Sequence, residues 1–210
     1  MKTQFIYVIR HSQTDDNLRR IYQGVSKDNS LNKTGQEQAR LLGQWMKDHY
    51  PPPELILSSP ARRPLETACI LTHEIMGNKK GCPIYVIREF HEINHGDWEG
   101  RSDEQVQKKY PELYKLWHER PMQVRFPNGE SMRGAKRRIL KAWVSEVLER
   151  KENIIMLVAH AGVNFQIINS VLESGKLRNV HQHNTCLNII ERKENGFSQM
   201  QLVNGTAHLL

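Results

Sequence analysis

Five apolar residues with high β propensity, Phe5–Ile9, run directly into Arg10 and His11. A short apolar run of this kind predicts a strand buried on both faces, as in a parallel sheet. In open α/β sheets, ligands bind just beyond the carboxyl ends of such strands. The sequence therefore puts a nucleophilic imidazole and a guanidinium, whose shape suits phosphate oxygens, where a site is expected. Taken alone, the dipeptide also fits a strand end that simply faces water.

Apolar runs and helical spacings alternate along the rest of the chain. Thr34 and Glu37 have the form of a capping box, and Ser58-Ser59-Pro60 has the form of a cap with a first-turn proline. Strands that alternate with helices predict an α/β fold, a three-layer α/β/α sandwich with a mostly parallel central sheet. The expected elements after the first strand are strands at 54–57, 84–87 and 154–158, helices at about 36–48, 60–77, 131–150 and 163–172, and a hairpin of 187–192 with 197–203 around Asn195-Gly196.

Two segments depart from this alternation. Residues 12–33 are polar and too irregular to assign. Residues 90–130 are aromatic and polar, with short helices expected to break near Pro111 and Pro121. We interpret 90–130 as an excursion over the active site within a single domain of residues 1–210, rather than as a second domain.

The composition limits the classes of ligand that this chain is expected to bind. The 30 Lys and Arg against 23 Asp and Glu give a net charge of +7, which favours anionic ligands. Because no basic run occurs, we expect small phosphates rather than nucleic acid. No apolar stretch approaches the ~18 residues that a membrane span needs. The three scattered cysteines form no Cys-x-x-Cys pair, so neither a disulfide framework nor a zinc ribbon is expected, and a reducing cytoplasm is the default location.

The predicted strand ends collect residues that suit phosphate chemistry. The second strand leads to Arg62-Arg63, the fourth ends at His160, and Glu92 lies between the third and fourth. Two histidines, two arginines and a carboxylate are the minimum set for phosphoryl transfer through a phosphohistidine. One histidine attacks phosphorus, the arginines neutralise its oxygens and the carboxylic acid protonates the leaving oxygen.

Ordinary structural roles exist for each of these residues taken singly. His160 alone fits a core histidine, Arg62-Arg63 fit a solvated helix face, and Glu92 fits a loop acid. A metal site built from histidines is another alternative, but their spacing matches no metal motif, so neither metal nor other cofactor is expected. The histidines considered for that metal site are His11, His91, His95 and His160.

Six motifs in order along the chain resemble those of the histidine phosphatase superfamily, in its phosphoglycerate mutase-like branch 1. The first reads Arg-His-Ser-Gln-Thr-Asp-Asp-Asn, and the last contains the second histidine. The resemblance spans nearly the whole chain and implies a phosphoglycerate mutase-like fold. The motifs lie at Arg10–Asn17, Leu31–Ala39, Ser58–Ala68, Glu92–Gly100, Pro127–Ser131 and Val158–Gly162.

The resemblance also implies roles. His11 would be the phosphorylated nucleophile and Glu92 the proton donor. Arg10, Arg63 (rather than Arg62) and His160 would hold the phosphoryl oxygens. Ala161, where the other branch places its aspartate acid, indicates branch 1. The further phosphate- or substrate-binding positions would be Ser12, Asn17, Gln23, Gly24 and Ala161.

Two residues depart from the family pattern without removing a catalytic group: Ser12 and Asn128 each replace a glycine. The function expected first is a metal-independent phosphomonoesterase acting on a small phosphate ester. The alternatives are a phosphoglycerate mutase-type phosphotransferase and a catalytically weak phospholigand-binding regulatory protein. Against the mutase, the segment 93–126 is shorter than the mutase insertion. The sequence leaves the substrate and the oligomeric state open.

Overall fold

The structure, a computed structural model, describes residues 3–77, 82–172 and 180–210. Its described strands form one six-stranded sheet in the order β3-β2-β4-β1-β5-β6. Neighbouring strands among β3, β2, β4 and β1 are parallel, whereas β5 is antiparallel to both β1 and β6. The predicted α/β class with a mostly parallel sheet is confirmed. The strands are β1 (Thr3–Arg10), β2 (Leu55–Ser58), β3 (Ile84–Val86), β4 (Ile154–Ala159), β5 (Leu187–Lys193) and β6 (Ser198–Gly205).

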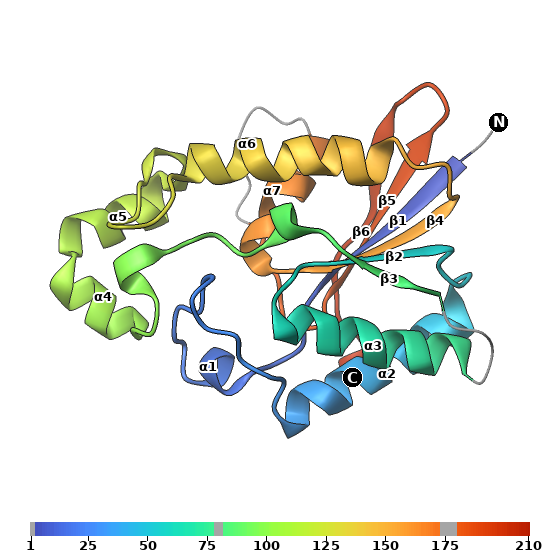
Figure 1. Cartoon of the computed structure of the whole chain (residues 1–210), viewed down its shortest axis with the longest axis horizontal. Helices are drawn as coiled ribbons and strands as arrows, with labels where there is room; N and C mark the ends of the chain where they lie inside the picture. The colour runs from blue at the N-terminus through green and yellow to red at the C-terminus, as the bar shows by residue number, and fades with distance from the viewer. Residues whose placement is uncertain (1–2, 78–81, 173–179) are drawn as a thin grey trace.

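Helices cover both faces of the sheet, as Figure 1 shows. Helices α2 (Lys33–His49) and α3 (Arg62–Met76) lie on one face, and α6 (Met132–Ala142) and α7 (Ala161–Leu172) lie on the other. Side chains of β1 alternate between the two cores. Ile6 and Val8 pack towards α6 and α7, while Tyr7 and Ile9 pack towards α2 and α3. This alternation within one apolar run produces the three layers.

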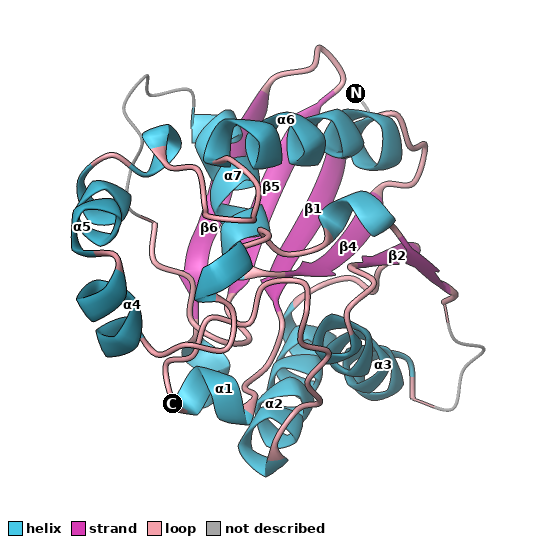
Figure 2. Cartoon of the chain, turned by 60° about the vertical axis from the view of Figure 1, so that its left-hand side comes forward, coloured by secondary structure: helices cyan, strands magenta, loops and turns pink. Residues whose placement is uncertain are grey.

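The excursion at 90–130 forms its own group of short helices beside the carboxyl edge of the parallel strands. Figure 2 shows α4 and α5 set apart from the sheet. Within the excursion, buried Trp98 packs its ring against Phe126, with centroids 5.1 Å apart, and both side chains belong to the same apolar cluster as residues of β1, β4, α6 and α7. The remaining elements are α1 (Asp15–Leu18), η1 (Arg88–Phe90), η2 (Gly96–Trp98), α4 (Asp103–Lys109), α5 (Pro111–Glu119), η3 (Pro121–Gln123), the π-helical η4 (Trp143–Leu148) and η5 (Ala207–Leu209).

Two local predictions about helix starts are wrong. Helix α2 begins at Lys33 because the side chain of Asn32, not Thr34, accepts from the backbone of Gly35 at 2.8 Å. Helix α3 begins at Arg62 with no side-chain cap, so Ser59 is free for another contact. The prediction that short helices break near Pro111 and Pro121 is confirmed: α4 ends at Lys109, α5 runs from Pro111 to Glu119, and η3 begins at Pro121. Pro111 is tolerated at the first position of α5 because the N–H that it lacks would have no partner there.

Two other local predictions are confirmed. Ser131 caps α6 by accepting from the backbone of Gly134 at 3.1 Å. Asn195 and Gly196 lie in the turn that joins β5 to β6. Among the described helices, none is long and apolar enough to cross a membrane.

Candidate active site

A cavity of about 260 Å³ lies beyond the carboxyl ends of β1, β2 and β4. Strand β1 delivers Arg10 and His11 to it, α3 delivers Arg63, and the loop after η1 delivers Glu92. Parallel pairing of β1 with β4 and of β4 with β2 brings these distant segments to one edge. The predicted residues Asn17, Gln23, Gly24 and Ala161 also line the cavity.

The His11 imidazole is fixed in one orientation and one tautomer. Its Nδ1 lies 2.8 Å from the backbone oxygen of Ser12, which accepts and therefore requires the proton on Nδ1. Its Nε2 then carries the lone pair and accepts from Nε of Arg63 at 3.3 Å. Burial, followed by the charges of Arg63 and Arg10, holds the pKa of His11 well below its ordinary value. A neutral imidazole whose Nε2 carries a lone pair rather than a proton is a competent nucleophile.

Two guanidinium groups surround this nucleophile. Arg63 is 1% exposed, and its terminal nitrogens donate to the backbone oxygens of Gly24 at 3.0 Å and Lys27 at 3.1 Å. Neighbouring Arg62 instead points outwards and pairs with Glu66 at 2.7 Å. Arg10 donates to the backbone oxygen of Gln182 while its Nε is buried without a partner.

His160 ends β4 immediately beside His11. The two ring centroids are 5.2 Å apart. The ring of His160 is fully buried, and its Nε2 lies 2.7 Å from the hydroxyl of Ser59. Its Nδ1 has no partner. Burial and the charge of Arg63 hold the pKa of His160 well below its ordinary value.

The Glu92 carboxylate is held by two backbone amides. Its Oε1 accepts from Ile93 at 2.8 Å and its Oε2 accepts from Gly162 at 3.4 Å. A Cβ at position 162 would lie 2.5 Å from Oε1, so a glycine is needed for α7 to approach the carboxylate. Glu92 also acts electrostatically on both cations, since its charge raises the pKa of Arg10 and of Arg63 against the effect of burial.

Ser12, like His160, is a predicted binding residue that does not line the cavity. Its side chain is fully buried, and its hydroxyl has no partner. Its backbone N–H donates to the hydroxyl of Thr67 at 3.1 Å. The replacement of glycine by serine therefore places a side chain behind the nucleophile rather than beside a ligand.

Sequence reasoning missed residues that hold the site together. Asn184 donates to the backbone oxygen of His11 at 3.1 Å and to Oδ1 of Asn17 at 3.2 Å. Glu99 accepts from the backbone amides of Val25 at 3.0 Å and Ser26 at 2.8 Å. The signal for Asn184 was its place in the polar run directly before β5. Cavity-lining residues that were not predicted are Ile21, Tyr22, Ile93, His95, Trp117 and Gly162.

The described residues contain no group of three or more histidine, cysteine or carboxylate side chains that could hold a metal ion. Of the histidines considered for a metal, His95 is enclosed by rings, with Phe126 at 4.7 Å and Tyr22 at 5.4 Å between centroids. The arrangement instead combines a neutral nucleophile, two cations and one carboxyl group. These groups can bind an anionic phosphate, attack it and move one proton.

Comparisons with known proteins agree with this geometry. The family described as the histidine phosphatase superfamily (branch 1) matches residues 6–205. Phosphoserine phosphatase 1 of Hydrogenobacter thermophilus is 35% identical over 159 residues, which are 74% of this chain and 70% of the relative. A 2,3-bisphosphoglycerate-dependent phosphoglycerate mutase of Methylorubrum populi is 26% identical, over 81% of this chain and 79% of the relative. The structure of Bacillus stearothermophilus YhfR shares the fold, with a TM-score of 0.86, 24% identity and coverage of 99% of this chain and 100% of the other.

Proposed function

Because this chain belongs to branch 1 of the histidine phosphatase superfamily, we propose that it hydrolyses phosphomonoesters through a phosphohistidine on His11. The observation that carries the proposal is the His11 ring itself. Its Nδ1 is committed to Ser12, and its Nε2 lone pair faces the guanidinium of Arg63. A phosphate held by that guanidinium is therefore presented to the attacking nitrogen.

In the first step, His11 Nε2 forms a bond to phosphorus while the bond from phosphorus to the ester oxygen breaks. Glu92, in its protonated form, gives its proton to that oxygen, so an alcohol leaves. The guanidinium groups of Arg10 and Arg63 stabilise the charge on the phosphoryl oxygens. The hydrogen bond from Nδ1 to the Ser12 oxygen keeps the phosphorylated ring in place.

His160 supplies a further donor to the phosphoryl group. If the Ser59 hydroxyl donates to Nε2, across the 2.7 Å separation, the proton of the neutral ring lies on Nδ1. That Nδ1 has no partner among the residues that the structure describes. A phosphoryl oxygen beside His11 would accept from it, which explains why an unpaired polar atom is kept in a fully buried position.

In the second step, water attacks the phosphohistidine. The bond between nitrogen and phosphorus breaks, inorganic phosphate forms, and the Glu92 carboxylate takes the proton of the water. Metal ions are not needed in either step, because the two arginines neutralise the transferred group. The helix N-termini of α3 and α7, which open at Arg62 and Ala161, add to the preference for an anion.

A mutase-type transfer to a second substrate hydroxyl uses the same chemistry, and curated mutases are among the relatives. Hydrolysis is favoured because phosphoserine phosphatase 1 is 35% identical to this chain, whereas the two mutases are 26% and 28% identical. A purely regulatory, non-catalytic protein is disfavoured, since His11, Glu92 and His160 are all present at the site.

The proposal is tested by trapping the intermediate. Rapid acid-free quenching with ³²P-labelled substrate should leave acid-labile, base-stable label on the wild-type protein and none on His11→Ala. Turnover of 4-nitrophenyl phosphate should survive EDTA treatment. Near-wild-type turnover by His11→Ala would overturn the mechanism. Activity that EDTA abolishes and a divalent cation restores would require a metal-dependent reaction instead.

A further inference from the structure

A second, larger cavity opens beside the phosphate cavity. It measures about 690 Å³, against about 260 Å³ for the cavity at His11. The two share lining residues, Arg10 and Ile93 among them, so they are adjacent compartments. A phosphate bound at His11 would therefore direct its ester group into the larger compartment. A volume of this size is typical of sites for drug-sized ligands.

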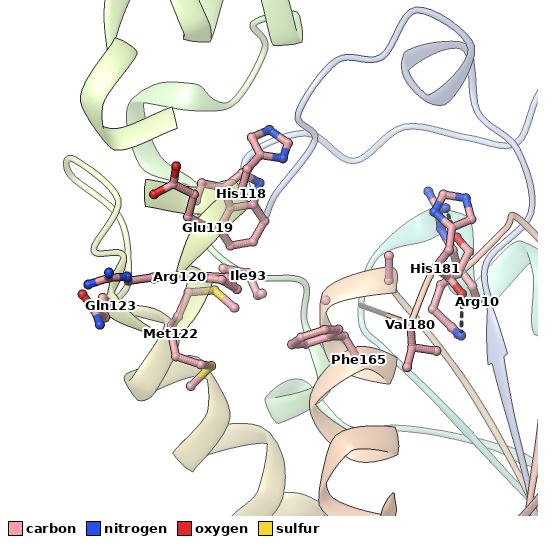
Figure 3. Close-up of a pocket in the computed structure, with 16 residues that line it drawn as sticks. Arg10, Ile93, His118, Glu119, Arg120, Met122, Gln123, Phe165, Val180 and His181 are labelled. Atoms are coloured by element: carbon pink, nitrogen blue, oxygen red, sulfur yellow. Dashed lines mark hydrogen bonds between the residues drawn. The ribbon is translucent and has the colours of Figure 1, made fainter. Parts of the chain in front are cut away.

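Apolar side chains from separate elements form the walls of the larger compartment. Phe165 projects from α7 on one side, and Met122 projects from η3 on the opposite side (Figure 3). Trp117 from α5 and the buried Met132 from α6 add an aromatic ring and a second thioether. Aromatic rings and flexible methionine side chains suit planar or irregular apolar groups.

Apart from Arg10, which it shares with the phosphate cavity, this compartment has its charged side chains at the outer edge. Glu119 is its one lining carboxylate among the described residues, and it is exposed and points away from Phe165 (Figure 3). Arg120 is also exposed and directed outwards. An amino acid ester such as phosphoserine carries an ammonium and a carboxylate on its leaving group. The ammonium would meet no buried carboxylate among the described lining residues, and the carboxylate would have to compete with the phosphate for Arg10, so binding would leave charge unpaired.

Resting on the proposed hydrolysis, we propose that the preferred substrates are phosphomonoesters whose leaving alcohol carries a large, mainly apolar or aromatic group. Phe165, Met122 and Trp117 determine that preference. The phosphate compartment fixes the reacting end, and the apolar compartment selects the remainder. Burial of one phenyl ring there is expected to raise kcat/KM by ~10- to 100-fold.

The test compares primary alkyl phosphates whose leaving alcohols have similar acidity, so that the chemical step is matched. Ethyl, 2-phenylethyl and 2-(naphthyl)ethyl phosphate are compared with O-phosphoserine by kcat/KM. We expect kcat/KM for each of the two arylalkyl esters to exceed that for ethyl phosphate at least tenfold, because they bury more apolar surface. O-Phosphoserine should have the lowest kcat/KM of the four. Phe165→Ala and Met122→Ala should each lower the ratio of arylalkyl to ethyl phosphate by about fivefold.

Two controls separate the possible failures. Phe197→Ala removes a ring that is 55% exposed on the distant β5–β6 hairpin, and it should leave the ratio unchanged. Phe165→Trp fills the compartment and should penalise the naphthyl ester more than the phenyl ester. Three results would overturn this inference without contradicting the proposed hydrolysis. They are an arylalkyl-to-ethyl ratio of kcat/KM near one, a preference for O-phosphoserine, and a high ratio that no substitution of Phe165 or Met122 changes. Absence of His11-dependent hydrolysis of any of the esters would overturn the proposed function itself.

Discussion

The carboxylate of Glu99 accepts hydrogen bonds from the loop that holds Arg63. Neutralising this carboxylate should lower both the stability of the fold and the activity of the site. Oε1 accepts from the backbone amides of Val25 and His95, each at 3.0 Å, and Oε2 accepts from Ser26 at 2.8 Å. The same loop supplies the oxygens of Gly24 and Lys27 to the Arg63 guanidinium. Glu99→Gln keeps the shape and one acceptor oxygen but turns an NH₂ group towards the Ser26 amide.

The magnitude follows from these three contacts. A hydrogen bond to a charged group contributes about 1.5–3 kcal/mol, and a neutral one contributes about half as much. Glu99→Gln loses the Ser26 bond and weakens the other two. Since the loop is partly exposed, we expect the lower end, a loss of about 2 kcal/mol in the free energy of unfolding. At an m-value of about 2 kcal/mol/M, the urea midpoint should fall by about 1 M.

Loosening Arg63 should also slow phosphoryl transfer. Removing a transition-state donor outright costs ~10²–10³-fold, so a displaced one should cost about tenfold in kcat/KM. Gly24→Ala should have the same effect from the other side of the contact, because its Cβ would lie only 1.8 Å from Oε1 of Glu99. Glu104→Gln, a charge loss at an exposed position on α4, is the matched control.

Urea unfolding followed by tryptophan fluorescence, and steady-state kinetics at a temperature where every variant is folded, test this reasoning. A Glu99→Gln protein within about 0.5 kcal/mol of wild type, the range of ordinary surface changes, would refute the stability argument. Unchanged kcat/KM despite lower stability would show that the loop does not position Arg63.

Three further outcomes follow from the site and its surroundings. Glu92→Gln should slow the phosphorylation step by ~10²–10⁴-fold for alkyl phosphates but far less for 4-nitrophenyl phosphate, whose leaving group needs no proton; equal losses in single-turnover kinetics would remove Glu92 as the acid. Ser12→Ala should match or exceed wild-type stability by about 1 kcal/mol in urea unfolding, because it deletes a buried hydroxyl that has no partner; a clear destabilisation would mean that the hydroxyl is bonded. Burial lowers the pKa of His208 to about 4, so below pH 6.5 the unfolded chain takes up a proton at this residue that the folded chain does not, and His208 should contribute a loss of stability of about 1.4 kcal/mol per pH unit down to pH 4; His11 and His160 add to the total slope, so His208→Gln should reduce that slope by the His208 share, and an unchanged slope would contradict the assignment.

The sequence predicted what depends on strand ends, and it missed what depends on contacts between loops. Arg10, His11 and His160 were predictable because each follows a buried parallel strand, and parallel pairing brings such ends together. Asn184 was not predictable, because it precedes the antiparallel strand β5. The hairpin pattern predicts that β5 pairs with β6, but it does not predict that β5 also pairs with β1. The pairing sets the start of β5 beside the end of β1, which is why this amide reaches His11.

Ser59 and Glu99 illustrate two further limits. Ser59 has the sequence context of a helix cap, yet its hydroxyl lies against His160, 101 residues away, since α3 begins later than its pattern predicts. Glu99 lies in the same motif as Glu92, and the motif does not indicate what its carboxylate contacts. Its oxygens are occupied by backbone amides of a loop more than 70 residues earlier in the chain. Contacts of such long range depend on tertiary packing, which local sequence patterns do not encode.

The site keeps polar groups in conditions that a stable core would avoid. Nε of Arg10 and Nδ1 of His160 are buried without partners, and an unpaired buried polar group costs about 1–3 kcal/mol. Burial also lowers the pKa of both Arg10 and Arg63, which means that their charged forms are held at a cost. In the proposed reaction, the transferred phosphoryl group supplies acceptors for all of these donors at once. These donors need no reorganisation when charge develops on the phosphoryl oxygens. The folded protein therefore bears the cost of holding them unpaired, and the transition state is stabilised when they bind it.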